Sequence, residues 1–215
     1  MTDKHSNRYA VPEDENFEPG AEEGILKNFL KIKSKDKIEI IEEQELQRTE
    51  LELLEIFDEN HCFSAEDLCN IHELWLGDVY PFAGKYRTVN MEKAGFPFAP
   101  AINIAKLMVA FEKEYLSNYT PCHYTDLDEL AYALGVVHVE FIIIHPFREG
   151  NGRTARLLAD LMVMQAKKPP LNYTAIDQTQ NPEGFSHYIL AIHAGFTGDY
   201  SLIKNIFKLL IEQSI

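Results

Sequence analysis

The segment that most constrains the fold of this chain runs from Leu134 to Ile144, where a helix would be apolar on nearly every side. Such a helix belongs in the middle of a helical bundle, because a surface helix carries polar residues on its outer face. His145 follows directly, and Pro146 disfavours the helical conformation for it, so the chain must leave the helix there. The sequence therefore predicts a mainly helical bundle whose central helix ends in a histidine delivered from the core.

Apolar residues that recur at helical spacing predict further helices around this centre. The expected helices cover residues 21–32, 36–57, 64–77, 101–119 and 125–144, the segment from the following loop to residue 168, and two segments that begin near residues 181 and 199. Ser64-Ala-Glu-Asp67 resembles a capping box, and Pro182 stands at the favoured first position of its helix. Between Tyr86 and Pro100 the pattern becomes extended, with a turn at Lys93-Ala-Gly95, which predicts one short β-hairpin.

Charge limits the partners that the chain can bind. Its 20 basic and 34 acidic residues give a net charge of -14, which repels nucleic-acid phosphates and anionic membrane surfaces over most of the molecule. Of only six arginines, three fall within nine residues, at Arg148, Arg153 and Arg156. We therefore expect no nucleic-acid partner and no membrane partner, but one small cationic site.

Cysteine usage and the N-terminal residues indicate a protein made in the cytoplasm. Cys62, Cys69 and Cys122 are odd in number and lack Cys-x-x-Cys spacing, so we expect reduced core thiols rather than a disulfide framework or a zinc site. The first residues lack the apolar core of a secretion signal, and no run of about 18 apolar residues predicts a membrane span. Export by a dedicated secretion machinery would leave no such mark and stays open.

The loop after His145 has the composition of a polyphosphate site. It leads into a new helix through Gly150-Asn-Gly152, and the free N–H groups of a helix N-terminus favour a bound anion together with the helix dipole. Arg153 and Arg156 lie on the same side of that helix, so both can reach one anion through charge-assisted bonds. A Walker-type loop and a dinucleotide fold are excluded, because Gly-x-x-x-x-Gly-Lys-Ser/Thr is missing and the loop follows a helix.

Three further side chains of this segment have expected roles. Glu149 is a carboxylate inside a cationic loop, which suits Mg²⁺ held against phosphates, although an ordinary solvated glutamate is also stabilised at a helix start. His145 can be neutral near pH 7 and accept a proton from an attacking hydroxyl, or it can be a buried, hydrogen-bonded core histidine. Phe147 is expected to pack the loop onto the core.

The complete string His145-Pro-Phe-Arg-Glu-Gly-Asn-Gly-Arg-Thr-Ala-Arg156 resembles the signature of the Fic (Fido) family, His-x-Phe-x-Asp/Glu-Gly-Asn-Gly-Arg-x-x-Arg, at every defined position. The resemblance extends to Ile71-His-Glu-Leu-Trp75, to Val79-Tyr-Pro-Phe-Ala-Gly84 and to the hairpin. Ile25-Leu-Lys-Asn28 is similar to the N-terminal helices of the family's stand-alone bacterial toxins.

This resemblance implies a Fic-type helical bundle with a short β-hairpin flap over the active site. It also implies a domain organisation. The expected parts are an N-terminal irregular segment and helical extension (residues 1–60), a Fic/Fido catalytic core (residues 61–207) and the end of the C-terminal helix (residues 208–215).

The activity implied by the resemblance is transfer of AMP from ATP to a Ser, Thr or Tyr hydroxyl of a target protein, with release of pyrophosphate. His145 would deprotonate the hydroxyl, and Glu149 would coordinate Mg²⁺ that bridges the α- and β-phosphates. The implied ATP-binding residues are Gly150, Asn151, Gly152 and Arg153 for the α- and β-phosphates, and Arg156 for the γ-phosphate. The hairpin, including Met91 and Lys93, would clamp the target segment by strand addition.

Many members of the family carry an inhibitory helix, Ser/Thr-x-x-x-Glu-Gly/Asn, whose Glu pairs with the second arginine. Thr179-Gln-Asn-Pro-Glu-Gly184 fits these letters, but Pro182 should open a helix there, so Thr179 and Glu183 would not share one helical face. The resemblance thus favours a separate antitoxin-like chain that supplies the Glu to Arg156 in trans. Inhibition in cis stays the alternative.

Two other functions fit parts of the pattern. Relatives in the family transfer other phosphate-containing groups, as kinases or by attaching phosphocholine, but the kinase-like branch departs from the Gly-Asn-Gly that this chain keeps. The second alternative is an inactive module that only binds a nucleotide or a partner, and the intact His145 and Glu149 argue against it. The target stays open: similarity to bacterial toxins suggests topoisomerase subunits, whereas an exported effector would modify host GTPases.

Overall fold

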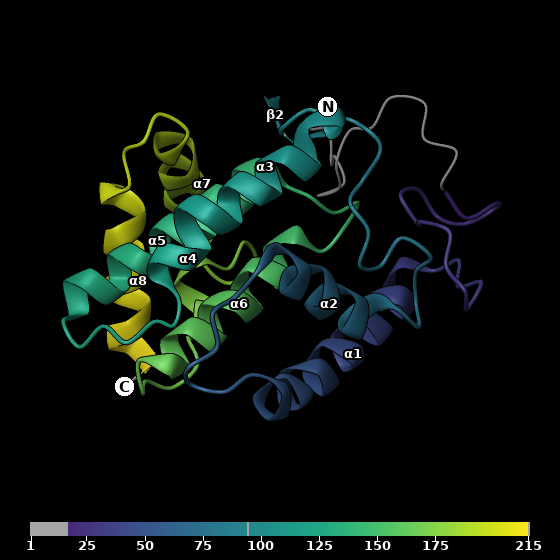
Figure 1. Ribbon diagram of the computed structural model, residues 1–215. Coiled ribbons are helices and arrows are strands. Elements are labelled where there is room, and N and C mark those ends of the chain that lie inside the picture. The colour runs from purple at the N-terminus through teal and green to yellow at the C-terminus, as the bar shows by residue number, and fades with distance from the viewer. Residues whose placement is uncertain (1–16, 94, 215) are drawn as a thin grey trace.

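The computed structural model describes residues 17–93 and 95–214 and confirms a mainly helical bundle with one small sheet (Figure 1). In these residues the helices are α1 (Lys35–Ile56), α2 (Ala65–Leu76), α3 (Ile104–Phe111), α4 (Ser117–Tyr119), α5 (Leu127–Ile144), α6 (Asn151–Gln165), α7 (Pro182–Gly195) and α8 (Ser201–Ser214), with the short helical pieces η1 (Ala101–Asn103), η2 (Glu112–Leu116) and η3 (Tyr173–Ile176). The antiparallel sheet consists of β1 (Glu92–Lys93) and β2 (Phe96–Pro97). None of the described helices combines the length and the apolar character that a membrane crossing requires.

Helix α5 lies at the centre of the bundle, as its apolar sequence predicts. Side chains on several of its faces are buried, including Leu134, Val137 and Phe141, and it packs against α3, α6, α7 and α8. Figure 1 shows α7 and α8 on one side of the molecule and α1 with α2 on the other. The residue that caps α5 is Asp126 rather than the predicted Thr125, because the Asp126 carboxylate accepts two first-turn amides at 2.9 and 3.0 Å.

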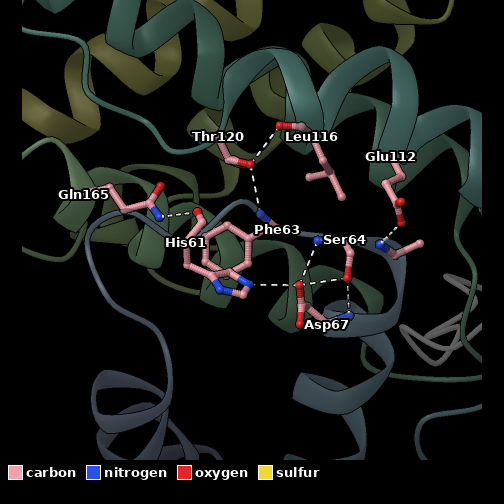
Figure 2. Close-up of polar contacts among 9 residues, drawn as sticks. His61, Phe63, Ser64, Asp67, Glu112, Leu116, Thr120 and Gln165 are labelled. Atoms are coloured by element: carbon pink, nitrogen blue, oxygen red, sulfur yellow. Dashed lines mark hydrogen bonds and ion pairs between the residues drawn. The ribbon is translucent and has the colours of Figure 1, made fainter.

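Figure 2 shows how the N-terminal end of α2 is anchored. Ser64 and Asp67 form the predicted capping box: the Ser64 hydroxyl accepts the Asp67 amide at 3.1 Å, and the Asp67 carboxylate accepts the Ser64 amide at 2.8 Å. The Phe63 amide donates to the Thr120 hydroxyl at 3.0 Å, and a Glu112 carboxylate oxygen accepts the first amide of α2 at 2.7 Å. These bonds fix α2, which carries two residues of the site described below, against the segment that follows α3.

Residues 21–32 are not helical, and the prediction of a helix there is wrong. Ile25 and Leu26 are buried, as the apolar pattern requires, but the backbone around them follows turns. The Asn28 side chain donates to the carbonyls of Leu26 and Ile32 and accepts the Ile32 amide at 2.8 Å. An asparagine that satisfies backbone groups in this way offers the chain an alternative to helical hydrogen bonds.

The remaining differences lie at the ends of elements. The predicted hairpin is present, but its strands are only two residues long and pair Glu92 with Pro97 and Lys93 with Phe96. The long helix predicted after the hairpin is divided into η1, α3, η2 and α4, and α6 ends at Gln165 rather than at residue 168. The helices that begin near residues 181 and 199 are present as α7 and α8.

Candidate active site

His145 closes α5 in a left-handed backbone conformation, with φ 52° and ψ 61°, so the chain leaves the helix where Pro146 predicts. Its Nδ1 lies 3.1 Å from the carbonyl oxygen of Ile142. Because a carbonyl only accepts hydrogen bonds, Nδ1 carries the ring proton and Nε2 carries the lone pair. In this neutral tautomer the imidazole can accept a proton from a hydroxyl at Nε2.

The imidazole of His145 is covered by the flap. Phe98, which follows β2, stacks on it with ring centroids 3.7 Å apart and planes 11° apart, and His145 is only 4% exposed. Burial lowers the pKa of His145 to about 3, and the positive charges of Arg87 and Lys93 act in the same direction. The ring is therefore neutral near pH 7. The sequence alone does not single out Phe98, because the stacking depends on where the hairpin returns.

Arg87 joins the flap to the end of α5. Its buried guanidinium donates to the His145 carbonyl at 2.7 Å. It also donates to the carbonyls of Val89 and Ala99, which flank the hairpin, at 2.6 Å each. The Arg87 backbone amide donates to the carbonyl of Pro146 at 2.8 Å. The Arg87 side chain thus fixes the position of both ends of the flap relative to His145, the candidate base.

The loop between α5 and α6 is held by side chains beneath it. Asn151 is fully buried, and its amide group accepts the Phe147 N–H and donates to the Phe147 carbonyl, both at 2.8 Å. The Phe147 ring stacks on His72 of α2 with centroids 4.0 Å apart. His72 Nδ1 accepts the Gly84 amide at 2.9 Å, so its Nε2 carries the proton and donates to the Glu149 carbonyl at 3.0 Å. The Asn151 side chain, predicted to help bind phosphates, therefore bonds the loop itself.

The two glycines of the loop differ in what they make possible. Gly150 has φ 82°, and a Cβ placed on it would come within 2.6 Å of the Trp75 ring, so both conformation and packing require glycine there. A Cβ on Gly152 would meet nothing within 4 Å. Packing within the described chain thus does not explain Gly152, whereas close approach of a phosphate to the first turn of α6 would.

Arg153 and Arg156 leave the first turns of α6 towards α1. Arg153 Nη1 lies 2.9 Å from a carboxylate oxygen of Glu42 in α1, and its Nη2 lies 3.7 Å from Glu149 Oε1. The Arg156 guanidinium lies over the Tyr173 ring, 4.9 Å from its centroid. Both arginines line a cavity of about 560 Å³ between α1 and α6. The structure thus brings together the two cations that the sequence spacing predicts.

Glu149 is suitably placed for a metal that arrives with a nucleotide. Its side chain is 14% exposed and accepts the Gly150 amide at 3.0 Å. Within residues 17–93 and 95–214, no three His, Cys, Asp or Glu side chains gather closely enough to hold a metal by themselves. Mg²⁺ is commonly held by one or two carboxylates together with substrate phosphates. A single carboxylate beside the open space at Gly152 fits this arrangement.

Of the two predicted flap residues, Lys93 lies close to the loop. Burial lowers the pKa of Lys93, and the negative charge of Glu149 in the loop acts on this pKa in the opposite direction. Met91 is 3% exposed, and its carbonyl accepts the Phe98 amide at 3.1 Å. The Met91 side chain therefore packs in the interior, and any part that Met91 has in clamping a target would fall to its backbone.

The sequence model of the Fic/DOC family matches residues 62–163, which include α2, the flap, α5 and the loop. The chain carries a Fic/DOC family domain. Curated relatives of this Fic domain include protein adenylyltransferase fic-1 of Caenorhabditis briggsae, 31% identical over 143 residues, and protein adenylyltransferase VbhT of Bartonella schoenbuchensis, 31% identical over 142 residues. These alignments cover 66% and 63% of this chain but only 26% and 28% of the relatives, so the chain spans about a quarter of their length.

Solved Fic structures share the fold of this chain. BepC of Bartonella tribocorum, solved with bound AMPPNP, has a TM-score of 0.72 at 21% identity and covers 91% of this chain and 95% of its own. The N-terminal Fic domain of a VirB-translocated effector of Bartonella quintana, solved with bound ADP, has a TM-score of 0.72 at 20% identity and covers 91% and 93%. The Fic-type bundle with a hairpin flap is thereby confirmed.

Proposed function

We propose that this Fic domain transfers AMP from ATP to a Ser, Thr or Tyr hydroxyl of a target protein. The observation that carries the proposal is His145, held as the neutral Nδ1–H tautomer at the start of a loop that Asn151 and Phe147 lock against the N-terminus of α6. Relatives named protein adenylyltransferase, and solved Fic structures with AMPPNP or ADP, support a nucleotide substrate.

The reaction follows from the positions of these groups. His145 Nε2 accepts the proton of the target hydroxyl while the hydroxyl oxygen bonds to the α-phosphorus. The bond from the α-phosphorus to the bridging oxygen breaks, and pyrophosphate leaves with its electrons. The amides of Asn151, Gly152 and Arg153 offer N–H groups to the charged oxygens, and Arg153 with Arg156 binds the β- and γ-phosphates. Glu149 would hold Mg²⁺, which neutralises charge on the phosphates when bound.

The flap controls access of the target to the base. Because Phe98 covers His145, the target must displace this ring or the flap must shift before the hydroxyl can approach. Strands β1 and β2 are only two residues long, so strand addition would supply few main-chain bonds and little reading of the target sequence. Lys93, near Glu149, is the flap side chain that we expect to lie beside the reacting groups.

An inhibitor acting in trans is part of the proposal. Helix α7 begins at Pro182, so Thr179 lies outside the helix that contains Glu183, and the two do not form one continuous inhibitory helix. The cavity beside Arg156 has apolar walls that include Leu46 and Leu54, which suits a partner helix that brings its own carboxylate to the arginine. If Glu183 does not inhibit in cis, Glu183→Gly should label targets at the wild-type rate. A much faster Glu183→Gly variant would refute inhibition in trans.

The transfer itself is tested with ATP carrying label on the α-phosphate or on the γ-phosphate. Incubated with a cell lysate, the wild-type protein should attach the α-label to protein, and His145→Ala should not. Label from the γ-phosphate alone would identify a kinase, and no label from either position would indicate a binding module. Glu149→Ala should lose transfer and magnesium-dependent ATP binding together, and full activity in this variant would refute its role.

A further inference from the structure

We propose that Glu42 of α1 is a positioning residue that orients Arg153 for the phosphates of ATP. The proposal rests on the function proposed above, because it assigns Arg153 to phosphate binding. Helix α1 lies outside residues 62–163, which the Fic/DOC family model matches. An element that precedes the family signature therefore supplies part of the nucleotide site.

Glu42 is a buried carboxylate whose groups are all engaged. It is 1% exposed, and its Oε2 lies 2.9 Å from Arg153 Nη1. Its other oxygen, Oε1, accepts the hydroxyl of Tyr80. The Glu42 backbone carbonyl accepts the indole N–H of Trp75 at 2.9 Å. A carboxylate this deep is stable only when its partners satisfy it, so Glu42 and Arg153 are expected to keep this geometry.

Trp75 completes the support of Arg153. The Arg153 guanidinium lies over its ring, 4.4 Å from the centroid, and the same ring is the neighbour that excludes a Cβ from Gly150. A guanidinium is a rigid, planar fork of five donors, so pairing at Nη1 and stacking on an indole together fix the direction of the remaining N–H groups. Arg153 and the loop between α5 and α6 are thus held by one cluster, which consists of Glu42, Trp75 and Tyr80.

The cluster provides its own probe of nucleotide binding. Trp75 is the only tryptophan of the chain and is fully buried, so its emission reports on the site without a label. We expect ATP with Mg²⁺ to change this emission saturably in the wild-type protein. Glu42→Gln, which keeps the shape but removes the charge, should raise the Kd for ATP about tenfold, the loss of one charge-assisted bond.

The matched control is Glu39→Gln, which removes the same charge from an exposed position of the same helix. Its Kd for ATP should stay within about twofold of wild type, because screened charges at a distance contribute little. In the transfer assay, Glu42→Gln should raise KM for ATP by the factor seen in Kd and leave kcat within about twofold, since Arg153 holds the same phosphates before and during the reaction. In an Arg153→Ala background, Glu42→Gln should have no further effect on Kd.

Equal Kd values for ATP in Glu42→Gln and Glu39→Gln would overturn the proposal. A tenfold increase in Kd caused by Glu42→Gln in the Arg153→Ala background would also overturn it. A wild-type protein whose Trp75 emission does not respond to ATP would overturn it too. If Glu42→Gln unfolds, which a red-shifted Trp75 emission reveals, Tyr80→Phe carries the test. It frees one oxygen of Glu42 and should raise Kd about threefold, and an unchanged Kd contradicts the proposal. ATP binding without α-label transfer refutes the proposed function and leaves the role of Glu42 intact.

Discussion

Replacing Phe98 by alanine should raise the pKa of His145 and move the acid limb of the activity profile. The Phe98 ring stacks on the imidazole at 3.7 Å and is one of the groups that bury it. Burial is the largest cause that holds the pKa of His145 at about 3 instead of 6.5, which corresponds to roughly 5 kcal/mol against the charged ring. Opening one face of the ring to water removes part of that cost, so the pKa in Phe98→Ala should move towards 6.5.

The sign of the effect on activity follows from the role of a base, which must be neutral. Wild-type His145, with a pKa of about 3, stays neutral down to pH 5. A ring with a pKa near 6.5 is only roughly 10% neutral at pH 5.5. We therefore expect kcat/KM of Phe98→Ala to fall up to about tenfold between pH 7.5 and 5.5, while the wild-type value does not fall for this reason. The kcat/KM profile is the right measure, because it reports groups of the free enzyme.

Proton NMR of the histidine ring measures the same pKa without any substrate. The His145 resonance is assigned by its loss in His145→Ala, and it should not titrate between pH 5 and 8 in the wild-type protein. Phe96→Ala is the matched control, because Phe96 belongs to the same flap but stacks on His193, with centroids 4.6 Å apart. A wild-type His145 that titrates near 6.5, or a Phe98→Ala ring that does not titrate in this range, would contradict a role of Phe98 in keeping the His145 ring neutral.

Other substitutions and pH test the remaining geometry. Gly150→Ala should lower the free energy of unfolding by about 3 kcal/mol, because of the φ of 82° and the clash with the core. Gly152→Ala should keep the stability of the wild-type protein but weaken ATP binding. Equal melting temperatures of the two variants would contradict this difference. Arg87→Lys should lower transfer at least about tenfold, because lysine lacks the planar fork that reaches four carbonyls, and unchanged transfer by a folded variant would contradict this. Burial lowers the pKa of His72 to about 4 and the pKa values of His138 and His145 to about 3. The unfolded chain therefore binds more protons than the folded chain below pH 6.5, and the free energy of unfolding falls as the pH falls from 6.5 towards 4. Burial raises the pKa of Asp160 to about 7, so the folded chain takes up one proton here and this group stabilises the fold as the pH falls. The net loss in the free energy of unfolding from pH 7 to 5 is on the order of 3 kcal/mol. Urea unfolding at both pH values measures it, and equal or greater stability at pH 5 would be inconsistent with neutral buried rings.

Features that depend on neighbouring residues were predictable from the sequence, and features that depend on distant ones were not. The capping box at Ser64 and the exit from α5 at His145 follow from residues within four positions, and the structure confirms both. The helix expected near Asn28 fails because a side chain satisfies the backbone locally, a competition that apolar spacing does not reveal. Phe98 and Glu42 reach the site from a hairpin and a helix far away in sequence, so no local pattern indicated them.

The motif from His145 to Arg156 contains two kinds of residue that its letters do not distinguish. Asn151 and Phe147 are buried and bond or stack within the protein, so they determine where the loop amides lie. Gly152 has open space above it, and Arg153 is 31% exposed at the side chain, so these positions can meet a ligand. Loss of binding in an Asn151 variant therefore reports displaced amides rather than a lost phosphate ligand. Pre-organised donors stabilise charge because they need no rearrangement when it develops, so the buried residues of the motif would contribute to the proposed transfer by fixing the loop amides.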